Sequence, residues 1–241
     1  MTRPILHTFA ISHFSEKARW GLDWAGVDYE LRPSIPLLHI RNARRLRVPA
    51  SSVPILELND QAIQGSASIL DWASANGDLP NGAEEVEARV DGDLGRSIIP
   101  YFYGEAAVEQ PAIIPPLFHP GLTPFRRTLF NQSWPFVRRL MIAGMRLGPE
   151  RRERARARIE GELDWLDTNL ADGRPFYAGD KPGRGDIAAA ALLAPLLCPP
   201  EHPTYADLKL PPKMASECTA WAERPSFAHV KRMYANYRLK P

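Results

Sequence analysis

The order of strand and helix patterns in the first 76 residues constrains the fold more than any other feature of this sequence. An apolar run with β character at 5–9 precedes a helical pattern at 15–25, and a second strand pattern covers 28–32. Two short apolar runs within 53–63 flank an Asn-Asp turn and predict a β-hairpin, after which Gly65 opens a further helix. The order β-α-β followed by β-β-α predicts an α/β layer with a parallel pair of strands.

Strand patterning largely stops beyond a linker at 76–82 that is rich in Gly, Asn and Pro. Residues 83–99 repeat apolar side chains at four-residue spacing, and we expect Pro100 to break or kink that helix. The stretch 186–197 is almost wholly apolar, as a buried helix would be. Other helices are expected at 129–147, 150–170, 214–224 and 226–237, and irregular segments at 36–50 and 109–124. The sequence therefore predicts an α/β domain over 1–76 and an all-helical domain over 83–241.

Composition excludes several other classes of protein. Hydrophobic content of 44% and charged content of 24% are ordinary for a soluble globular chain, and no apolar run is long enough to cross a membrane. The two cysteines are too few for a disulfide scaffold, which favours a reducing cytoplasm. A net charge of +2 gives no indication of nucleic-acid binding, and the six histidines show no ligand pair at helical spacing. We expect a cytoplasmic protein without a metal, and with no membrane or nucleic-acid partner.

The turn between the first strand and the first helix, Ser12 to Ser15, is the best placed for chemistry. Backbone N–H groups at a helix start are free, and the helix dipole there favours negative charge. Either serine also suits the ordinary role of a helix N-cap, since Ser is a preferred residue there. Gly26 is expected to end the helix.

Four motifs in this order resemble the cytosolic glutathione transferases, in particular the bacterial, serine- or cysteine-type members similar to the theta, zeta and omega classes. Lys17-Ala18-Arg19-Trp20 resembles the family's basic-small-Arg run. Ser52-Val53-Pro54-Ile55-Leu56 resembles its Lys-Val-Pro-x-Leu motif, and Ile63–Ile69 resembles its x-Glu-Ser-x-Ala-Ile motif. The loop 176–180 followed by 183–187 resembles its conserved loop and capping box, so the resemblance covers residues 4–237.

The resemblance implies a thioredoxin-like N-terminal domain, an all-helical C-terminal domain and glutathione as co-substrate. A cis Val53–Pro54 bond would present Val53 as a strand edge on which a peptide can pair, whereas the alternative is an ordinary trans proline at a strand start. Ser66, at a helix N-terminus, suits the γ-glutamyl carboxylate. Asp186 is expected to have a structural capping role. The glutathione-binding residues are then expected to be Ser12, His39, Ser52, Val53, Pro54, Gly65 and Ser66.

Alignment with the family makes Ser12 the catalytic residue, because serine-type members place it seven residues before the Arg of the first motif. Ser15 is then the better candidate for the plain cap, and His13 a neighbour of the site. Lowering a thiol pKa by about two units requires about 2.7 kcal/mol. One hydrogen bond to an anion supplies about 1.5–3 kcal/mol, and the helix dipole adds about 0.3–1 kcal/mol. An apolar electrophile pocket is expected from His13, Tyr101 and Tyr103, with Phe102 and Trp134 nearby, although an ordinary core position is the alternative for each aromatic residue.

Three departures from the family pattern keep other functions open. Gly65 replaces an acidic residue, Ser52 a basic one and Gly183 the hydroxyl half of the capping box. His39 is a possible compensating contact for the glycyl carboxylate, and a surface or loop-packing His is the alternative. The first expectation is a glutathione transferase with a detoxification role. The alternatives are a non-catalytic glutathione-transferase-like carrier and a glutathione-dependent isomerase or dehalogenase. The family also implies a homodimer.

Overall fold

A computed structural model describes residues 3–238, and it places all the strands in one small sheet. The strand order is β2-β1-β3-β4, in which β1 is parallel to β2 and antiparallel to β3. β3 and β4 form the expected antiparallel hairpin, with Leu56 opposite Ile63. These findings confirm the α/β layer with one parallel pair. The strands are β1 Ile5–Thr8, β2 Glu30–Pro33, β3 Ile55–Glu57 and β4 Ala62–Gln64.

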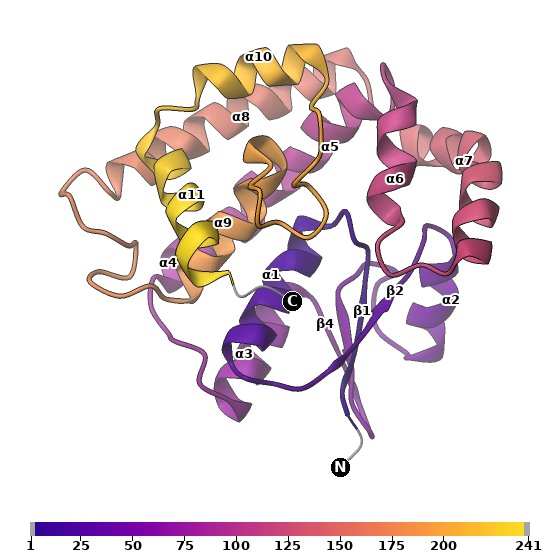
Figure 1. Ribbon diagram of the computed structural model, residues 1–241, viewed down its shortest axis with the longest axis horizontal. Helices are drawn as coiled ribbons and strands as arrows, with labels where there is room; N and C mark the ends of the chain where they lie inside the picture. The colour runs from indigo at the N-terminus through magenta and orange to yellow at the C-terminus, as the bar shows by residue number, and fades with distance from the viewer. Residues whose placement is uncertain (1–2, 239–241) are drawn as a thin grey trace.

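Three helices flank the sheet: α1 (His13–Trp24), α2 (Leu38–Arg45) and α3 (Ser66–Asn76). Figure 1 shows α1 and α3 together on one side of the strands and α2 on the other. As expected, Gly26 closes the end of α1, and it directly follows the C-cap Ala25. Gly26 has a φ of 69°, its N–H donates to Asp23, and the N–H of Val27 donates to Leu22. Only a residue that tolerates this left-handed conformation closes a helix in that way.

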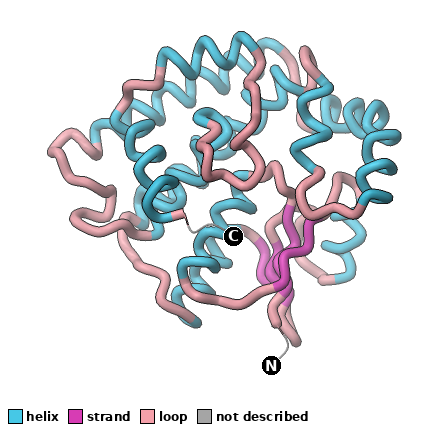
Figure 2. Tube along the Cα trace, in the orientation of Figure 1, coloured by secondary structure: helices cyan, strands magenta, loops and turns pink. Residues whose placement is uncertain are grey.

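The rest of the described chain consists of helices joined by loops, as Figure 2 shows. Figure 1 shows α9 (Arg184–Leu197) in the middle of these helices. Nearly every residue of α9 is buried, and the helix packs against α1, α4 and α11. Asp186 in its first turn accepts hydrogen bonds from the N–H groups of Gly183 (2.9 Å) and Tyr177 (2.8 Å), which confirms its structural role. The helices are α4 Glu84–Arg89, α5 Gly95–Ala106, α6 Ile114–Phe118, α7 Pro124–Gly144, α8 Pro149–Thr168, α9 Arg184–Leu197, α10 Pro212–Ala220 and α11 Pro225–Tyr237.

Two segments expected to be irregular contain helices. α2 lies within 36–50, and α6 with a short 3-10 turn at Pro111–Ile113 lies within 109–124. Neither helix has the Ser, Thr, Asp or Asn start signal on which prediction relies. α2 follows Leu37, which has a φ of 74°, and α6 follows Ile113. Tertiary contacts stabilise α2 instead: Asn42 donates to the His7 ring (2.8 Å), and Arg45 pairs with Glu57 (2.7 Å).

Of the break or kink expected at Pro100, the break is wrong. α5 continues through it to Ala106 and packs along α8. The irregularity comes earlier, in a π-helical turn at Val90–Leu94, where the N–H of Gly95 donates to the carbonyl of Val90. α7 likewise runs through Pro135 and begins earlier than predicted, capped by Thr123. In the described part of the chain, no helix combines the length and apolar character needed to cross a membrane.

Candidate functional site

A pocket of about 790 Å³ lies where the sheet layer meets α5 and α7. One wall is formed by the turn before α1, the segment before β3 and the start of α3. The other wall comes from α5, α6, α7 and the segment after α9. The structure thus brings together most of the residues predicted from motifs that are far apart in sequence. These are Ser12, His13, His39, Ser52, Val53, Pro54, Gly65, Ser66, Phe102 and Tyr103.

Ser12 is both a lining residue of this pocket and the N-cap of α1. Its Oγ accepts a hydrogen bond from the N–H of Ser15 at 3.2 Å. A hydroxyl has one proton and two lone pairs, so this contact leaves the Ser12 proton available for an anion in the pocket. The prediction that Ser15 is the cap was therefore wrong. α1 begins at His13, which makes Ser15 the third helical residue, whose N–H a cap normally binds.

Ser15 is buried inside α1 and does not line the pocket. It is 1% exposed, and its Oγ has no hydrogen-bond partner within residues 3–238. The structure thus separates the two serines, which sequence alone left as alternatives. Only Ser12 can reach a ligand in the pocket.

His13 connects the turn to the helical part of the molecule. Its Nε2 lies 3.0 Å from the carbonyl oxygen of Gly95, the first residue after the π-helical turn. Since a carbonyl only accepts, Nε2 carries a proton in this contact. Burial lowers the pKa of His13 to about 4. His13 therefore contributes no positive charge to the pocket near neutral pH.

The segment before β3 offers a strand edge to the pocket. The Val53–Pro54 peptide bond is cis, and the carbonyl of Pro54 accepts from the N–H of Gly65 (3.0 Å). Among the described residues, none forms a backbone hydrogen bond with the peptide groups of Val53. The Gln64 side chain secures the preceding loop by bonding the backbone of Ala50 and Ser52 at 2.7 Å each. Gln64 is a positioning residue that the sequence analysis did not identify.

The start of α3 is suited to bind an anion. Gly65 precedes it at a φ of 96°, a conformation that an acidic residue would adopt only with strain. The first-turn residues Ser66, Ala67 and Ser68 line the pocket, and their N–H groups have no carbonyl one turn earlier. No side chain caps this helix end. A carboxylate placed there would satisfy both the free N–H groups and the helix dipole.

The opposite wall is apolar and aromatic. Phe102 and Tyr103 project from α5, Phe118 from α6 and Met141 from α7, and Tyr205 comes from the loop after α9. The Tyr205 hydroxyl donates to the carbonyl of Ile11, which ties this distant loop to the turn before Ser12. Sequence reasoning missed Phe118, the α7 residues and Tyr205. They carry no motif and reach the pocket only through the tertiary fold.

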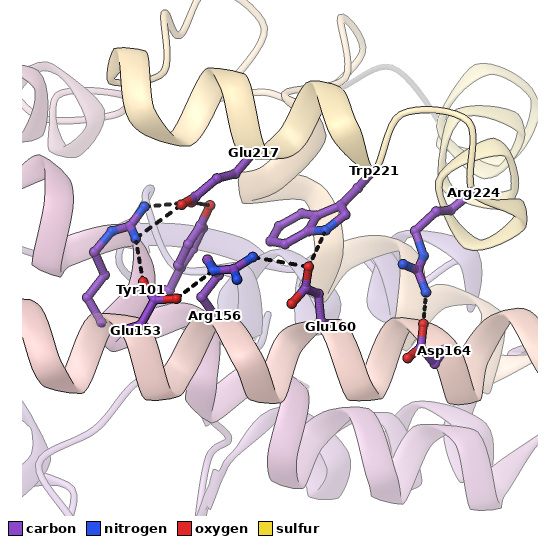
Figure 3. A network of polar contacts seen from close by, with 9 residues as sticks. Tyr101, Glu153, Arg156, Glu160, Asp164, Glu217, Trp221 and Arg224 are labelled. Carbon is purple, nitrogen blue, oxygen red and sulfur yellow. Dashed lines mark hydrogen bonds and ion pairs between the residues drawn. The ribbon is translucent and has the colours of Figure 1, made fainter.

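Tyr101 lies outside the pocket, contrary to its predicted place in the electrophile pocket. It is fully buried, and its hydroxyl donates to Glu217 of α10 at 2.6 Å (Figure 3). Burial raises its pKa above the ordinary value. Trp134 is also a core residue, whose indole donates to the carbonyl of Pro111. Three consecutive residues in a helix point in different directions, so Tyr101 and Tyr103 cannot share one face.

Polar residues at the rim come from the π-helical turn and the start of α5. Lys17 is fully buried and pairs with Glu87 (2.8 Å) and Asp91 (2.5 Å), so the basic residue of the first motif has a structural role. Asp91 lines the pocket beside Arg96. Within the described part of the chain, Arg96 makes no ion pair. Residues 3–238 contain no cluster of three His, Cys, Asp or Glu side chains that could hold a metal ion.

Comparison with known families identifies the family of this chain. The family model described as "Glutathione S-transferase, N-terminal domain" matches residues 6–80, and the one described as "Glutathione S-transferase, C-terminal domain" matches residues 149–224. This chain belongs to the glutathione S-transferase family. The resemblance inferred from the four motifs is thereby confirmed at the level of the family, and so is the predicted fold class. No curated protein matches this glutathione S-transferase family member.

Solved structures of glutathione transferases and of a β-etherase share the fold at low sequence identity. A glutathione S-transferase from Methylobacterium radiotolerans, in complex with glutathione sulfonate, is 24% identical, with 94% of this chain and 93% of that one covered at a TM-score of 0.55. The transferase GSTFuA3 from Phanerochaete chrysosporium is 14% identical over 99% and 98% of the chains, with a TM-score of 0.61. The β-etherase LigF from Sphingobium is 15% identical over 96% and 99%, with a TM-score of 0.52.

Proposed function

We propose that this protein is a glutathione transferase in which the Ser12 hydroxyl stabilises the glutathione thiolate. The observation that carries the proposal is the position of that hydroxyl. It lines the pocket with its proton free, beside the Val53 strand edge and the first turn of α3. These three features match the thiol, the peptide backbone and the γ-glutamyl carboxylate of one glutathione molecule.

Glutathione would bind as an added strand against Val53, with its γ-glutamyl carboxylate at the N–H groups of Ser66 to Ser68. Ser52, Pro54 and Gly65 would shape this part of the site. His39 would meet the glycyl carboxylate from the other end of the pocket. The centroid of its ring lies 4.8 Å from that of the Phe9 ring, and burial lowers the pKa of His39. His39 would therefore serve as a neutral hydrogen-bond donor.

The chemistry would begin with loss of the thiol proton to solvent. One charge-assisted hydrogen bond from Ser12 lowers the thiol pKa by about one to two units, because it stabilises the thiolate by about 1.5–3 kcal/mol. The α1 N-terminus adds about 0.3–1 kcal/mol. The thiolate sulfur then attacks an electrophilic carbon of the second substrate, and the leaving group departs with the electron pair of the broken bond.

The second substrate would be a small apolar electrophile. It would lie against Phe102, Tyr103, Phe118 and Met141, which face the thiolate position from the helical side of the pocket. Aromatic walls of this kind take apolar ligands and leave a few polar groups to orient them. His13 and Tyr103 are polar residues that line the pocket, and burial raises the pKa of Tyr103, so its hydroxyl stays protonated.

Two measurements test the proposal: glutathione binding by calorimetry, and conjugation of glutathione to a generic aryl halide. We expect wild type to bind glutathione and form the conjugate, and Ser12→Ala to bind it with a slower conjugation rate. Ser12→Thr, which keeps the hydroxyl and the cap, is the matched control and should retain activity. Absence of glutathione binding by the wild type would refute the proposal.

The second candidate function is a non-catalytic glutathione carrier. It is favoured by Ser52 and Gly65, which replace polar residues of the family motifs. Tight glutathione binding without conjugation, unchanged in Ser12→Ala, would support the carrier. A glutathione-dependent isomerase or dehalogenase would use the same thiolate and would be distinguished by its product. We also propose a cytoplasmic homodimer, with the two structural units at 1–76 and 83–241, on the strength of the family.

A further inference from the structure

Charge is distributed very unevenly along this chain. Residues 33–56 and 110–149 contain no Asp or Glu, although the whole chain has 28 of them. The first segment includes α2, and the second includes α6 and α7. The remaining residues hold 21 of the 30 Lys and Arg against all 28 acids, so they carry a net negative charge. The nine arginines of the two segments are Arg41, Arg44, Arg45, Arg47, Arg126, Arg127, Arg138, Arg139 and Arg146.

The same two segments carry most of the exposed apolar side chains. Seven large hydrophobic residues within 3–238 are exposed, and only Leu31 lies outside the two segments. Phe125 is 76% exposed and Phe136 is 60% exposed, both on α7. The others are Leu37, Leu38, Leu129 and Leu140. A helix with arginines and exposed aromatic residues but no acid is typical of a surface that binds lipid.

The two segments meet around the mouth of the pocket. Figure 1 shows α2, α6 and α7 on one side of the molecule. The Phe9 ring packs against both segments: its centroid lies 4.8 Å from that of His39 in α2 and 5.4 Å from that of Phe118 in α6. Leu37 and Leu140 both line the pocket and are both exposed. We call this surface, made of the exposed residues of 37–47 and 125–146, the arginine face.

Little within the molecule neutralises the arginine face. Arg45 pairs with Glu57, and Arg138 donates to the carbonyls of Ala107 and Val108, which leaves its charge uncompensated. In the described part of the chain, ion-pair partners are absent for the exposed arginines Arg41, Arg44, Arg47, Arg126, Arg127, Arg139 and Arg146.

We propose that the arginine face docks on an anionic lipid surface. The arginines would contact the headgroups, and Phe125 and Phe136 would enter the boundary between headgroups and acyl chains. A second copy of this chain fits the face less well, because a symmetric contact would place two sets of arginines opposite each other. A nucleic acid would use the charges but would not need exposed leucines.

The pocket would then open toward the lipid, because Leu37 and Leu140 belong to both surfaces. An apolar electrophile dissolved in the membrane could enter without crossing bulk water. This consequence rests on the proposed transferase function, whereas docking itself does not. A vesicle-binding experiment without glutathione therefore tests the docking alone.

The experiment is flotation of the full chain with vesicles of phosphatidylcholine, with and without phosphatidylglycerol. We expect binding to the anionic vesicles, little to the neutral ones, and weakening by salt. Arg126→Gln with Arg139→Gln should lower the partition coefficient by about 25-fold, at about fivefold for each arginine. The matched control is Arg154→Gln with Arg158→Gln on α8, whose side chains are 73% and 63% exposed. It removes the same charge and should change binding less than about threefold.

Phe125→Ser with Phe136→Ser separates lipid contact from charge alone. We expect this exposed pair to keep the fold, checked by circular dichroism, and to lose most vesicle binding. Full retention of binding by this variant would overturn the proposal, since a purely electrostatic contact also suits a polyanion such as nucleic acid. Equal binding to neutral vesicles, an equal loss in the α8 control, or no binding by the wild type would also overturn it. The proposal would also be overturned if the wild type forms a dimer that Phe125→Ser with Phe136→Ser dissociates, and the wild type does not bind vesicles.

Discussion

Replacing Ser12 by Ala should raise the pKa of the thiol of bound glutathione. The Ser12 Oγ already accepts from the Ser15 N–H at 3.2 Å, so the side chain would serve a thiolate only through its proton. A hydrogen bond to an anion is worth about 1.5–3 kcal/mol, and one pKa unit corresponds to about 1.36 kcal/mol. We therefore expect an increase of about one to two units. The dipole of α1 remains in the variant and limits the change.

The same substitution removes a helix cap, which complicates a simple activity measurement. Loss of a Ser cap costs about 0.5–2 kcal/mol of stability. Thr123→Ala is a matched control, because the Thr123 hydroxyl caps α7 in the same way, through the N–H of Arg126, and Thr123 does not line the pocket. This control should lose comparable stability without changing the thiol pKa.

The assay is a pH titration of the ultraviolet thiolate absorbance of the glutathione complex. It should be paired with kcat/KM for an aryl halide at a pH below the wild-type thiol pKa. There kcat/KM should fall about 10- to 100-fold in Ser12→Ala, in proportion to the lost thiolate. Ser12→Thr should behave like the wild type. An unchanged thiol pKa in Ser12→Ala, with glutathione still bound, would refute the assignment of Ser12.

Three further outcomes are expected. Burial lowers the pKa of His13 and His202 to about 4 and of His229 to about 3, below their ordinary value of 6.5. At a pH between the folded and the ordinary pKa values, the unfolded state therefore binds more protons than the folded state. Stability should therefore be fully present above pH 6.5 and fall as the pH drops toward 4; a flat stability profile by urea unfolding over that range would contradict this. Tyr101→Phe should lower the free energy of urea unfolding by about 1–2 kcal/mol and leave kcat/KM unchanged, because the lost hydroxyl is in the core. A change in kcat/KM without a change in stability would instead indicate that Tyr101 belongs to the pocket. Lys17→Met should cost about 3–5 kcal/mol, since it leaves Asp91 without its buried cation and Glu87 with Arg184 alone, and a loss below about 1 kcal/mol would contradict the role of this ion pair.

Local patterns predicted most of the elements around the site. The hairpin, the Gly26 helix end and the buried α9 each depend on side-chain periodicity or on a residue with a special backbone conformation. Such signals act over a few residues and can be read without a fold. The motifs also predicted that Ser12, Val53 and Ser66 serve one pocket, because the family places them there.

Errors occurred where tertiary contacts outweighed local preference. α2 forms without a start signal because Asn42 and Arg45 are held by His7 and Glu57 of the sheet. α5 continues through Pro100 because its packing on α8 compensates for the missing hydrogen bond. In both cases the stabilising groups are far away in the sequence.

The sequence by itself determined the strand and helix order, the motifs and the family, because these depend on residue type and spacing. Only the tertiary structure decided which serine faces the pocket, since a shift of the helix start by three residues would make Ser15 the cap in place of Ser12. It also decided that Tyr101 is a core residue and Tyr103 a pocket residue, which follows from the rotation of α5 against α8 and α10. The arginine face is likewise a product of the fold, which brings two acid-free segments that are separated by 53 residues in the sequence to one side of the molecule.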